Sequence, residues 1–185
     1  MTFQQSLGLR SLGGNLGQQY LEQCFGTDVD YRSIRNLRIQ LMDGWIAEHG
    51  VEPKPGIEEL LSYLNTHQIP CAITTSAPAD RARAYLTPLG LCQRFTKICS
   101  GHDLPHGKPA PDIYWEGAAQ LGLAPESCLA LEDSPAGITS AFRAGCLPVV
   151  IPDQDAPDSE TLTRCFARAD SLTDVVELLE ILQEN

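Results

Sequence analysis

The chain has 185 residues, of which 43% are hydrophobic and 20% are charged, and it carries a formal net charge of -11. This length suits one compact domain, or a core with a modest insertion. The acidic balance argues against a nucleic-acid-binding surface, which requires clustered Lys and Arg. No apolar stretch approaches the roughly 18 residues of a membrane span, and the first residues lack the basic and apolar regions of a secretory signal.

The cysteines point to the compartment. There are seven of them, an odd number, and no two form a C-x-x-C pair. Their neighbours are mostly apolar, which favours buried, reduced thiols over disulfides or a metal site. We therefore expect a cytoplasmic protein with neither a membrane nor a nucleic acid among its partners.

Residues 1–52 read differently from the rest. The segments "GQQYLEQCF" and "YRSIRNLRIQLMDGWIAEHG" have helical patterns and contain no convincing strand. The segment "VEPKPG" (51–56) follows, and Pro53 and Pro55 make it a stiff linker. The sequence thus predicts a small helical module before an α/β core.

From about residue 70, short apolar runs alternate with helical patterns. Strands are predicted at 70–74, 95–100, 128–132 and 147–151, and helices after Pro78, over 110–123 and over 135–145. A last helix is expected to begin after Ser171 as its N-cap, with Asp174 in the first turn. This alternation predicts a parallel sheet covered by helices on both faces, with its chemistry at the carboxyl ends of the strands.

Two of these strand ends carry groups that suit an anion. The first strand runs into the hydroxyls of Thr74, Thr75 and Ser76, which together with free backbone N–H groups can hold a phosphate. Capping of the next helix is the alternative. The next loop reads "HGKPAPD", where Gly107 and Pro109 fix the backbone around Lys108. A fixed ammonium suits a phosphoryl oxygen, although a solvated loop lysine is equally compatible with this motif alone.

The third strand ends in two adjacent carboxylates, Glu132 and Asp133. Repulsion and desolvation oppose such a pair unless a cation or a shared proton compensates it. Mg²⁺ takes one or two carboxylates and keeps several waters, so it fits here. The alternative is a helix N-terminus decorated with acids, which the helix dipole also favours. Taken together, the three motifs describe one pocket with hydroxyls, a cation and metal-binding carboxylates.

From about Pro53 onward, the chain resembles the haloacid dehalogenase-like hydrolases, within them the helical-cap branch with β-phosphoglucomutase and small sugar-phosphate phosphatases. The segment "AITTSAPADRARAYLTPLGL" is similar to the family's second motif, which implies that Thr75 binds the transferring phosphoryl group and that Ser76 lines the same turn. "GKPAPDIY" is similar to the third motif and implies that Lys108 steadies the nucleophile and the phosphate charge. "LEDSPAGI" is similar to the fourth and implies that Asp133 binds Mg²⁺ with Glu132 beside it.

The family's first motif, a strand ending in D-x-D-G-T, is not found in the sequence. Its first aspartate is the covalent nucleophile, and its second is the general acid and base. The "DVD" of residues 28–30 lies between helical patterns, and the "DQD" of residues 153–155 follows the last strand, so neither is expected to replace it. In the family, the first strand lies between the strands that carry the second and fourth motifs, so its loss exposes two sheet edges.

The resemblance implies a Rossmann-like parallel sheet with helices on both faces (residues 53–185, lacking its first strand) and a partial N-terminal helical cap (residues 1–52). It implies a Mg²⁺-dependent phosphatase or phosphomutase acting on a small phosphorylated metabolite such as a sugar phosphate. We expect this chain alone to be inactive, because the nucleophile motif is absent. Two alternatives remain: a catalytically dead fragment or pseudoenzyme that binds phosphate or a protein partner, and an unrelated α/β binding module.

Overall fold

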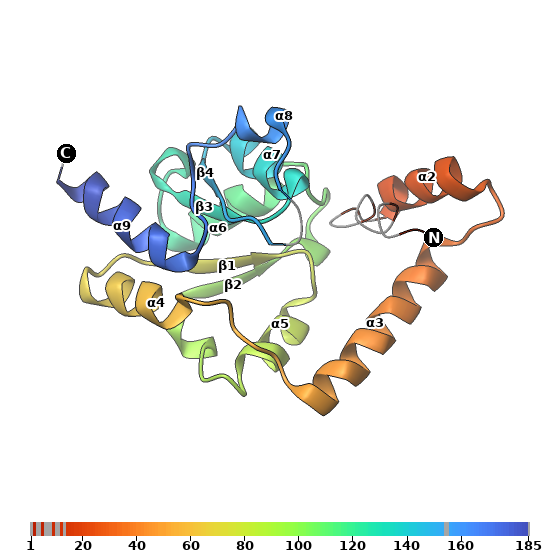
Figure 1. Ribbon diagram of the computed structural model, residues 1–185, viewed down its shortest axis with the longest axis horizontal. Coiled ribbons are helices and arrows are strands. Elements are labelled where there is room, and N and C mark those ends of the chain that lie inside the picture. The colour runs from red at the N-terminus through yellow and green to blue at the C-terminus, as the bar shows by residue number, and fades with distance from the viewer. Residues whose placement is uncertain are drawn as a thin grey trace. The chain divides into compact units, whose positions relative to one another are not determined.

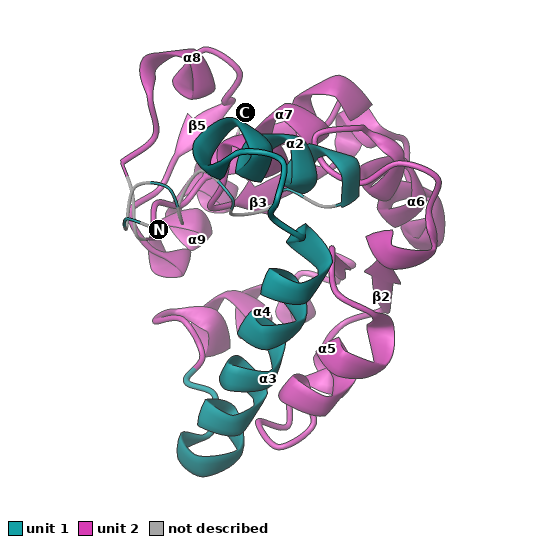
Figure 2. Cartoon of the chain, turned by 90° about the vertical axis from the view of Figure 1, so that its right-hand side faces the viewer, with its two compact units in different colours: residues 1–52 teal, residues 53–185 magenta. Residues whose placement is uncertain are grey.

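The computed structural model describes Thr2, Gln5, Leu9, Leu12, residues 14–153 and residues 156–184. Its contacts divide the chain into two compact units, unit 1 (Met1–Glu52) and unit 2 (Pro53–Asn185), coloured separately in Figure 2. None of the helices in the described residues is long and apolar enough to cross a membrane.

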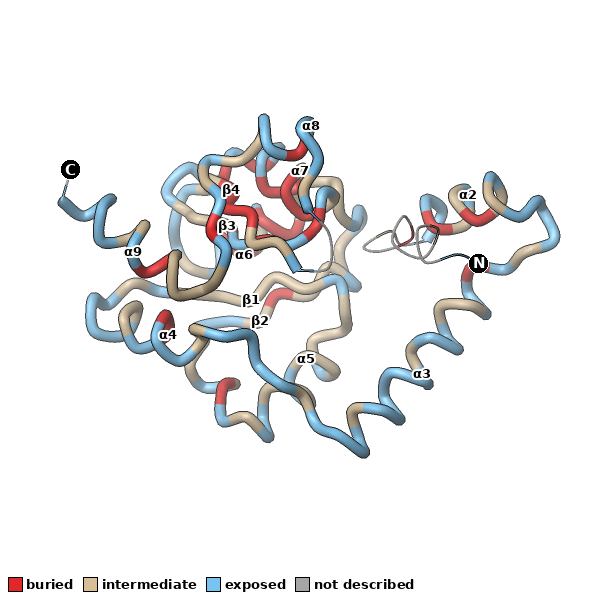
Figure 3. The backbone as a smooth tube through the Cα atoms, viewed as in Figure 1, coloured by how far each residue is buried: buried red, intermediate tan, exposed pale blue. Residues whose placement is uncertain are grey.

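Helices α2 (Gly14–Phe25) and α3 (Tyr31–His49) lie in the part of unit 1 that the structure describes. The Asp30 carboxylate caps α3 by accepting hydrogen bonds from the backbone N–H groups of Arg32 and Ser33. Tyr31 lies in a small buried cluster, and its hydroxyl donates to the Leu12 carbonyl at 2.7 Å. Most of α3 is exposed in Figure 3. Helices thus form where the local sequence pattern predicted them, although few of their side chains are buried to stabilise them.

Unit 2 is an α/β fold of short parallel strands and flanking helices (Figure 1). Its strands are β1 (Ala72–Thr75), β2 (Lys97–Ser100), β3 (Leu129–Glu132), β4 (Leu147–Val150) and β5 (Ala167–Arg168). Its helices are α4 (Ile57–Thr66), α5 (Ala79–Leu86), α6 (Asp112–Leu121), α7 (Pro135–Ala144), α8 (Ser159–Leu162) and α9 (Leu172–Gln183). Short 3₁₀ helices cover Cys92–Arg94, Gly101–Asp103 and Pro125–Ser127.

The strands form two sheets, and the division lies where the family resemblance implied two exposed sheet edges. β1 pairs with β2 in parallel, and β3, β4 and β5 pair in that order, also in parallel. β1 and β3, the strands that carry the second and fourth motifs, are not paired with each other in the described structure. The α/β class and the parallel pairing are as predicted, and the sheet is divided between these two strands.

The core of unit 2 is uneven. One buried cluster joins α6 and α7 to β3, and another joins α4 and α9 to β4. Buried residues concentrate in β3, β4 and α7 in Figure 3. None of the four residues of β1 is buried, whereas the sequence predicted a buried strand there. The reason is that β1 has a strand on one side alone.

Local signals at the helix ends were reliable. Ser171 caps α9 and Asp174 lies in its first turn, as predicted. The structure adds that the Ser171 hydroxyl and the Asp174 carboxylate accept hydrogen bonds from each other's backbone N–H groups, which forms a capping box. Helices α4 and α8 and the two-residue strand β5 were not predicted. All seven cysteines are free, but only Cys99 and Cys146 among them are buried, so the expectation of buried thiols holds for two positions.

Gly56 and Gly122 offer a test of how tightly α4 is joined to α9. Both have a left-handed backbone, with φ of 84° and 71°, so alanine at either position costs about 1–2 kcal/mol. A Cβ atom at Gly56 would also lie 2.6 Å from the backbone nitrogen of Thr173, whereas Gly122 faces open space. We expect Gly56→Ala to lower the free energy of unfolding by about 1–3 kcal/mol more than Gly122→Ala does. Urea unfolding measures both, and equal losses would contradict the packing described here.

Candidate active site

The Glu132 carboxylate at the end of β3 is the centre of a buried polar cluster. Its side chain is 7% exposed. The Lys108 ammonium and the Tyr114 hydroxyl both donate to its Oε1 atom, and the Ser134 hydroxyl lies 3.5 Å from Oε2. A carboxylate can remain charged in such a place only if donors and an opposite charge surround it. Both conditions are met here by residues from three separate elements.

The first turn of α7 lies directly against this carboxylate. The Ser134 hydroxyl caps α7 by accepting from the Gly137 backbone N–H at 3.2 Å. A Cβ atom at position 137 would lie 1.9 Å from Oε2 of Glu132, so only glycine leaves room for the carboxylate there. The N-terminal end of a helix also favours a nearby negative charge. The residues after the strand therefore shape the space that Glu132 occupies.

Lys108 is fixed by its backbone as well as by its ion pair. The Lys108–Pro109 peptide bond is cis. The carbonyl of Pro109 accepts from the Arg143 guanidinium at 3.1 Å, and that of Ala110 accepts from the Ser140 hydroxyl at 2.5 Å. These bonds attach the loop to α7, and the Lys108 side chain is 9% exposed. The alternative of a solvated loop lysine is therefore excluded.

Tyr114 links the ends of β1 and β3, a role that the sequence did not reveal. It is buried on α6, and burial, reinforced by the charge of Glu132, raises the pKa of its hydroxyl well above the usual value of 10. A hydrogen bond with Thr74 acts in the opposite direction. The hydroxyl is thus a neutral donor that contacts the last residue of β3 and a residue near the end of β1. The motif "GKPAPDIY" ends in this tyrosine, but its residue pattern alone indicates no role for it.

Thr75 is the last residue of β1, and Ser76 begins the turn that follows. The Thr75 hydroxyl accepts from the Ala77 backbone N–H at 3.1 Å and is half-buried, while Ser76 is exposed. Helix α5 has Pro78 at its N-cap position and no side-chain cap. The alternative that these hydroxyls cap the next helix is therefore not what the structure shows. Thr74 differs from Thr75 and Ser76, because its side chain forms a hydrogen bond with the Tyr114 hydroxyl.

Asp133 differs from its neighbour Glu132. It is exposed, whereas Glu132 is buried, as expected for successive residues that leave a strand on opposite sides. Lys108 compensates the charge of Glu132 from within the protein, although the sequence had suggested a bound cation for both carboxylates. In the part of the chain that the structure describes, no three His, Cys, Asp or Glu residues are grouped as a metal site. Asp133 is the carboxylate presented to solvent.

The "DVD" segment (28–30) and the "DQD" segment (153–155) contain the aspartates that the sequence analysis compared with the missing first motif. Asp30 is occupied as the N-cap of α3, and Asp28 is exposed in the turn before it. Asp153 forms an ion pair with Lys54 at the surface of unit 2. Asp155 lies outside the described residues.

Comparison with known proteins gives the relatives of this chain. The model of the haloacid dehalogenase-like hydrolases matches residues 6–151. The chain is 41% identical over 104 residues to hexitol phosphatase A of Escherichia coli (strain K12), covering 55% of this chain and 47% of that protein. It is 34% identical over 120 residues to the validoxylamine A 7'-phosphate phosphatase of Streptomyces hygroscopicus subsp. limoneus, covering 65% and 55%. The chain spans about half the length of these two curated relatives.

Solved structures share the fold. A β-phosphoglucomutase from Clostridium difficile superposes with a TM-score of 0.75 at 22% identity, covering 100% of this chain and 81% of that one. A hydrolase from Pseudomonas syringae has a TM-score of 0.80, also at 22% identity, covering 97% and 83%. At this identity, the likeness supports the α/β fold alone.

The buried ion pair can be tested by a double-mutant cycle on unfolding free energy. Lys108→Met or Glu132→Gln alone leaves an unpaired buried charge, and we expect each to cost about 3–5 kcal/mol. The double variant should cost less than the sum of the two, with a coupling of about 1–3 kcal/mol.

The exposed pair Arg94–Glu58, with side chains 32% and 66% exposed, is the matched control. Its cycle, with Arg94→Met and Glu58→Gln, should give a coupling below about 1 kcal/mol. A Lys108–Glu132 coupling no larger than this control would contradict the buried pair.

Proposed function

Because the chain belongs to the haloacid dehalogenase-like hydrolase family, we propose that unit 2 serves phosphoryl transfer from a small phosphorylated metabolite, such as a sugar phosphate. Two curated relatives are themselves named phosphatases. The observation that carries the proposal is the rigid presentation of Lys108 by Glu132, Tyr114 and α7 at the end of β3. The reaction is that of a phosphatase or a phosphomutase.

The proposed roles follow from the chemistry of each side chain. Lys108 stabilises the negative charge of the phosphoryl group, and Glu132 orients its ammonium. Thr75 and Ser76 bind phosphoryl oxygens through hydroxyl and backbone N–H donors at the turn after β1. A side chain that is held in place before the substrate binds need not reorganise during the reaction. Lys108 is such a side chain, because hydrogen bonds attach its loop to α7.

Asp133, with Glu132 beside it, is the proposed site of Mg²⁺. The donor set fits this ion, because a hard cation takes one or two carboxylates and completes its shell with water. Asp133 is exposed to solvent, and Glu132 beside it accepts from Lys108 and Tyr114. When bound, the ion would neutralise charge on the phosphoryl oxygens.

We further propose that these 185 residues by themselves do not turn over phosphate esters, since the sequence contains no D-x-D-G-T motif to supply the nucleophile. Unit 1 is proposed to be part of a helical cap. The second candidate function is binding of phosphate or a protein partner without catalysis, which the same buried Lys108 would support.

Phosphate release tests the catalytic proposal. With Mg²⁺, p-nitrophenyl phosphate and a panel of sugar phosphates, we expect no more release from this chain than from its Asp133→Asn variant. A variant extended ahead of residue 1 by a strand that ends in D-x-D-G-T should gain turnover and lose it again with Asp133→Asn. Turnover by the chain itself at roughly 1–10³ s⁻¹, abolished by Asp133→Asn, would show that a nucleophile had been missed, and Asp153 would be mutated next.

Mg²⁺ binding is a separate prediction. We expect millimolar affinity by calorimetry, because the number and charge of the ligands set affinity for hard cations and Asp133 is the main donor. Asp133→Asn should abolish the heat of binding, and Asp170→Asn, a change at an exposed carboxylate paired with Arg168, should leave it unaltered. An isotherm unchanged by Asp133→Asn would place the ion elsewhere.

A further inference from the structure

Cys128 and Cys146 lie at the beginning of neighbouring strands. The first directly precedes β3, and the second directly precedes β4. These strands pair in parallel with Leu129 opposite Leu147, and the same register, one residue further back, places Cys128 opposite Cys146. The Cys128 carbonyl accepts from the Leu147 backbone N–H at 2.9 Å, so the ladder of hydrogen bonds reaches these positions. The two cysteines are therefore neighbours across the ladder.

This register brings the two residues within the range of a disulfide. Paired strands lie about 4.7–4.9 Å apart, and a disulfide joins Cα atoms that are roughly 4.4–6.8 Å apart. Residues opposite each other in a parallel pair also project from the same face of the sheet. Burial agrees with this placement, because Cys146 belongs to the buried cluster of β3, α6 and α7, and Cys128 packs against that cluster.

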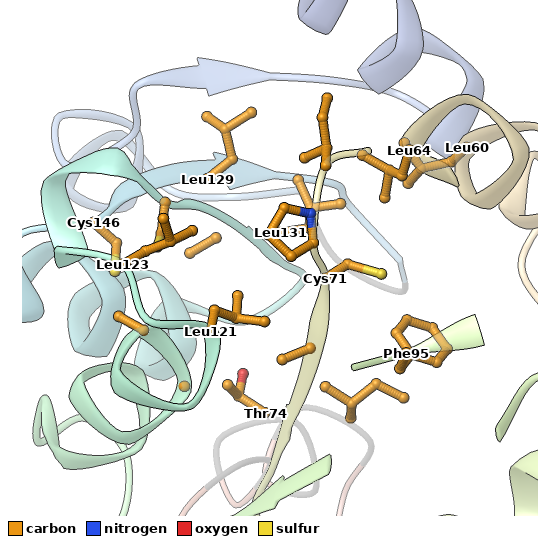
Figure 4. Close-up of a pocket in the computed structure, with 18 of the residues that line it drawn as sticks. Leu60, Leu64, Cys71, Thr74, Phe95, Leu121, Leu123, Leu129, Leu131 and Cys146 are labelled. Carbon is orange, nitrogen blue, oxygen red and sulfur yellow. The ribbon is translucent and has the colours of Figure 1, made fainter. Parts of the chain in front are cut away.

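Both cysteines line the same cavity. It is a pocket of about 430 Å³ in unit 2, and Cys146 is labelled in the close-up of Figure 4. None of the described residues that line this pocket is charged. Cys128 is half-buried, whereas Cys146 is 6% exposed. A reagent in the solvent therefore reaches the two thiols unequally, and it meets Cys128 first.

The surroundings of the pair keep both groups in the thiol form. Burial raises the pKa of each thiol, that of Cys146 to about 11. The charge of Glu126, in the 3₁₀ helix before β3, raises the pKa of both, and Cys128 raises that of Cys146 further. The hydroxyl of Tyr114 on α6, which also interacts with Cys146, is neutral. The influence of Cys128 on Cys146 agrees with the short separation that the register implies.

We propose that Cys128 and Cys146 form an oxidisable dithiol, which a small disulfide such as oxidised glutathione converts into an intrachain disulfide between the starts of β3 and β4. All seven cysteines are free in the structure, which corresponds to the reduced form. Cys99 provides a contrast, because it lies within β2 opposite Thr74 and not opposite a cysteine. This inference is independent of the proposed catalytic function.

The reaction consists of two thiol–disulfide exchanges. Deprotonated Cys128 attacks one sulfur of the oxidant, whose S–S bond breaks and releases one molecule of reduced glutathione. Deprotonated Cys146 then attacks the Sγ atom of Cys128, which forms the protein disulfide and releases a second molecule of reduced glutathione. The two thiols lose two protons and two electrons in total, and the oxidant takes up both. Because both pKa values are raised, the rate should increase roughly tenfold from pH 7 to pH 8.

The disulfide encloses the two carboxylates of the candidate active site. The chain between the cysteines contains β3, Glu132, Asp133 and α7. A cross-link that closes such a loop stabilises the fold mainly by restricting the unfolded chain. We therefore expect the oxidised chain to unfold at a higher midpoint temperature than the reduced chain.

Peptide mapping tests the inference on the unaltered chain. The whole chain is incubated with increasing proportions of oxidised to reduced glutathione, the remaining thiols are blocked with iodoacetamide, and the product is digested with a protease that cleaves after Glu. This cleavage isolates Cys128 in residues 127–132 and Cys146 in residues 133–160. We expect mass spectrometry to find these two peptides joined by a disulfide.

Variants of the protein separate the two exchanges. Cys146→Ser should stop at a glutathione adduct on Cys128, and Cys128→Ser should give no adduct on Cys146, because that thiol is buried. Cys165→Ser, at another half-buried thiol of unit 2, is the matched control and should still form the link. The increase in midpoint temperature on oxidation should occur in the unaltered chain and in this control, and it should be absent from Cys128→Ser.

The same titration in concentrated urea shows what the fold contributes. Because the paired strands hold the two thiols side by side, the native chain should form the link at a concentration of oxidised glutathione at least tenfold lower than the unfolded chain requires. An equal requirement would overturn the inference. So would a native chain in which residues 127–132 and 133–160 stay unlinked in excess oxidised glutathione, or in which either peptide is joined to a different cysteine.

Discussion

A carboxylate remains charged inside a protein only where donors surround it, and Glu132 imposes this requirement on the surrounding structure. The Lys108 loop must reach the end of β3, α6 must bring the Tyr114 hydroxyl to the same oxygen, and α7 must begin with Gly137 where a side chain would collide. The loop, in turn, is attached to α7 through Arg143 and Ser140. One buried charge thus connects the Lys108 loop and α6 to the end of β3 and the start of α7.

This arrangement also gives the neighbouring residues Glu132 and Asp133 different environments. The sequence raised the question of why Glu132 and Asp133 are adjacent, and a bound cation was the answer it suggested. In the structure, Glu132 is compensated by Lys108, and Asp133 is exposed. Burial therefore assigns one carboxylate to holding a lysine and leaves the other at the surface, a distinction that depends on the direction of each side chain and is not visible in the residue types.

Much of unit 2 could be predicted because its signals are local. Apolar runs marked four strands within about two residues of their ends, and a hydroxyl followed by an acid marked the start of α9. The family resemblance, which the family model confirms, depended on three short motifs of the same local kind. The two-residue strand β5 is too short to leave a pattern, whereas the division between β1 and β3 followed from the resemblance, which placed the absent first strand there. The role of Tyr114 could not be predicted from local signals, because its hydrogen-bond partners come from two other elements, β1 and β3.

The divided sheet has a consequence for the order of folding. β1 and β2 are joined by residues 76–96, and β3 and β4 by residues 133–146, so each pair forms from neighbouring stretches of chain. No strand pairing in the described structure connects the first pair to the second, and the connection rests on α6 and on the packing of α4 against α9. Short-range pairing closes small loops and is fast. The two strand pairs therefore close shorter loops than do the helix contacts that join them, those of α4 with α9 in particular.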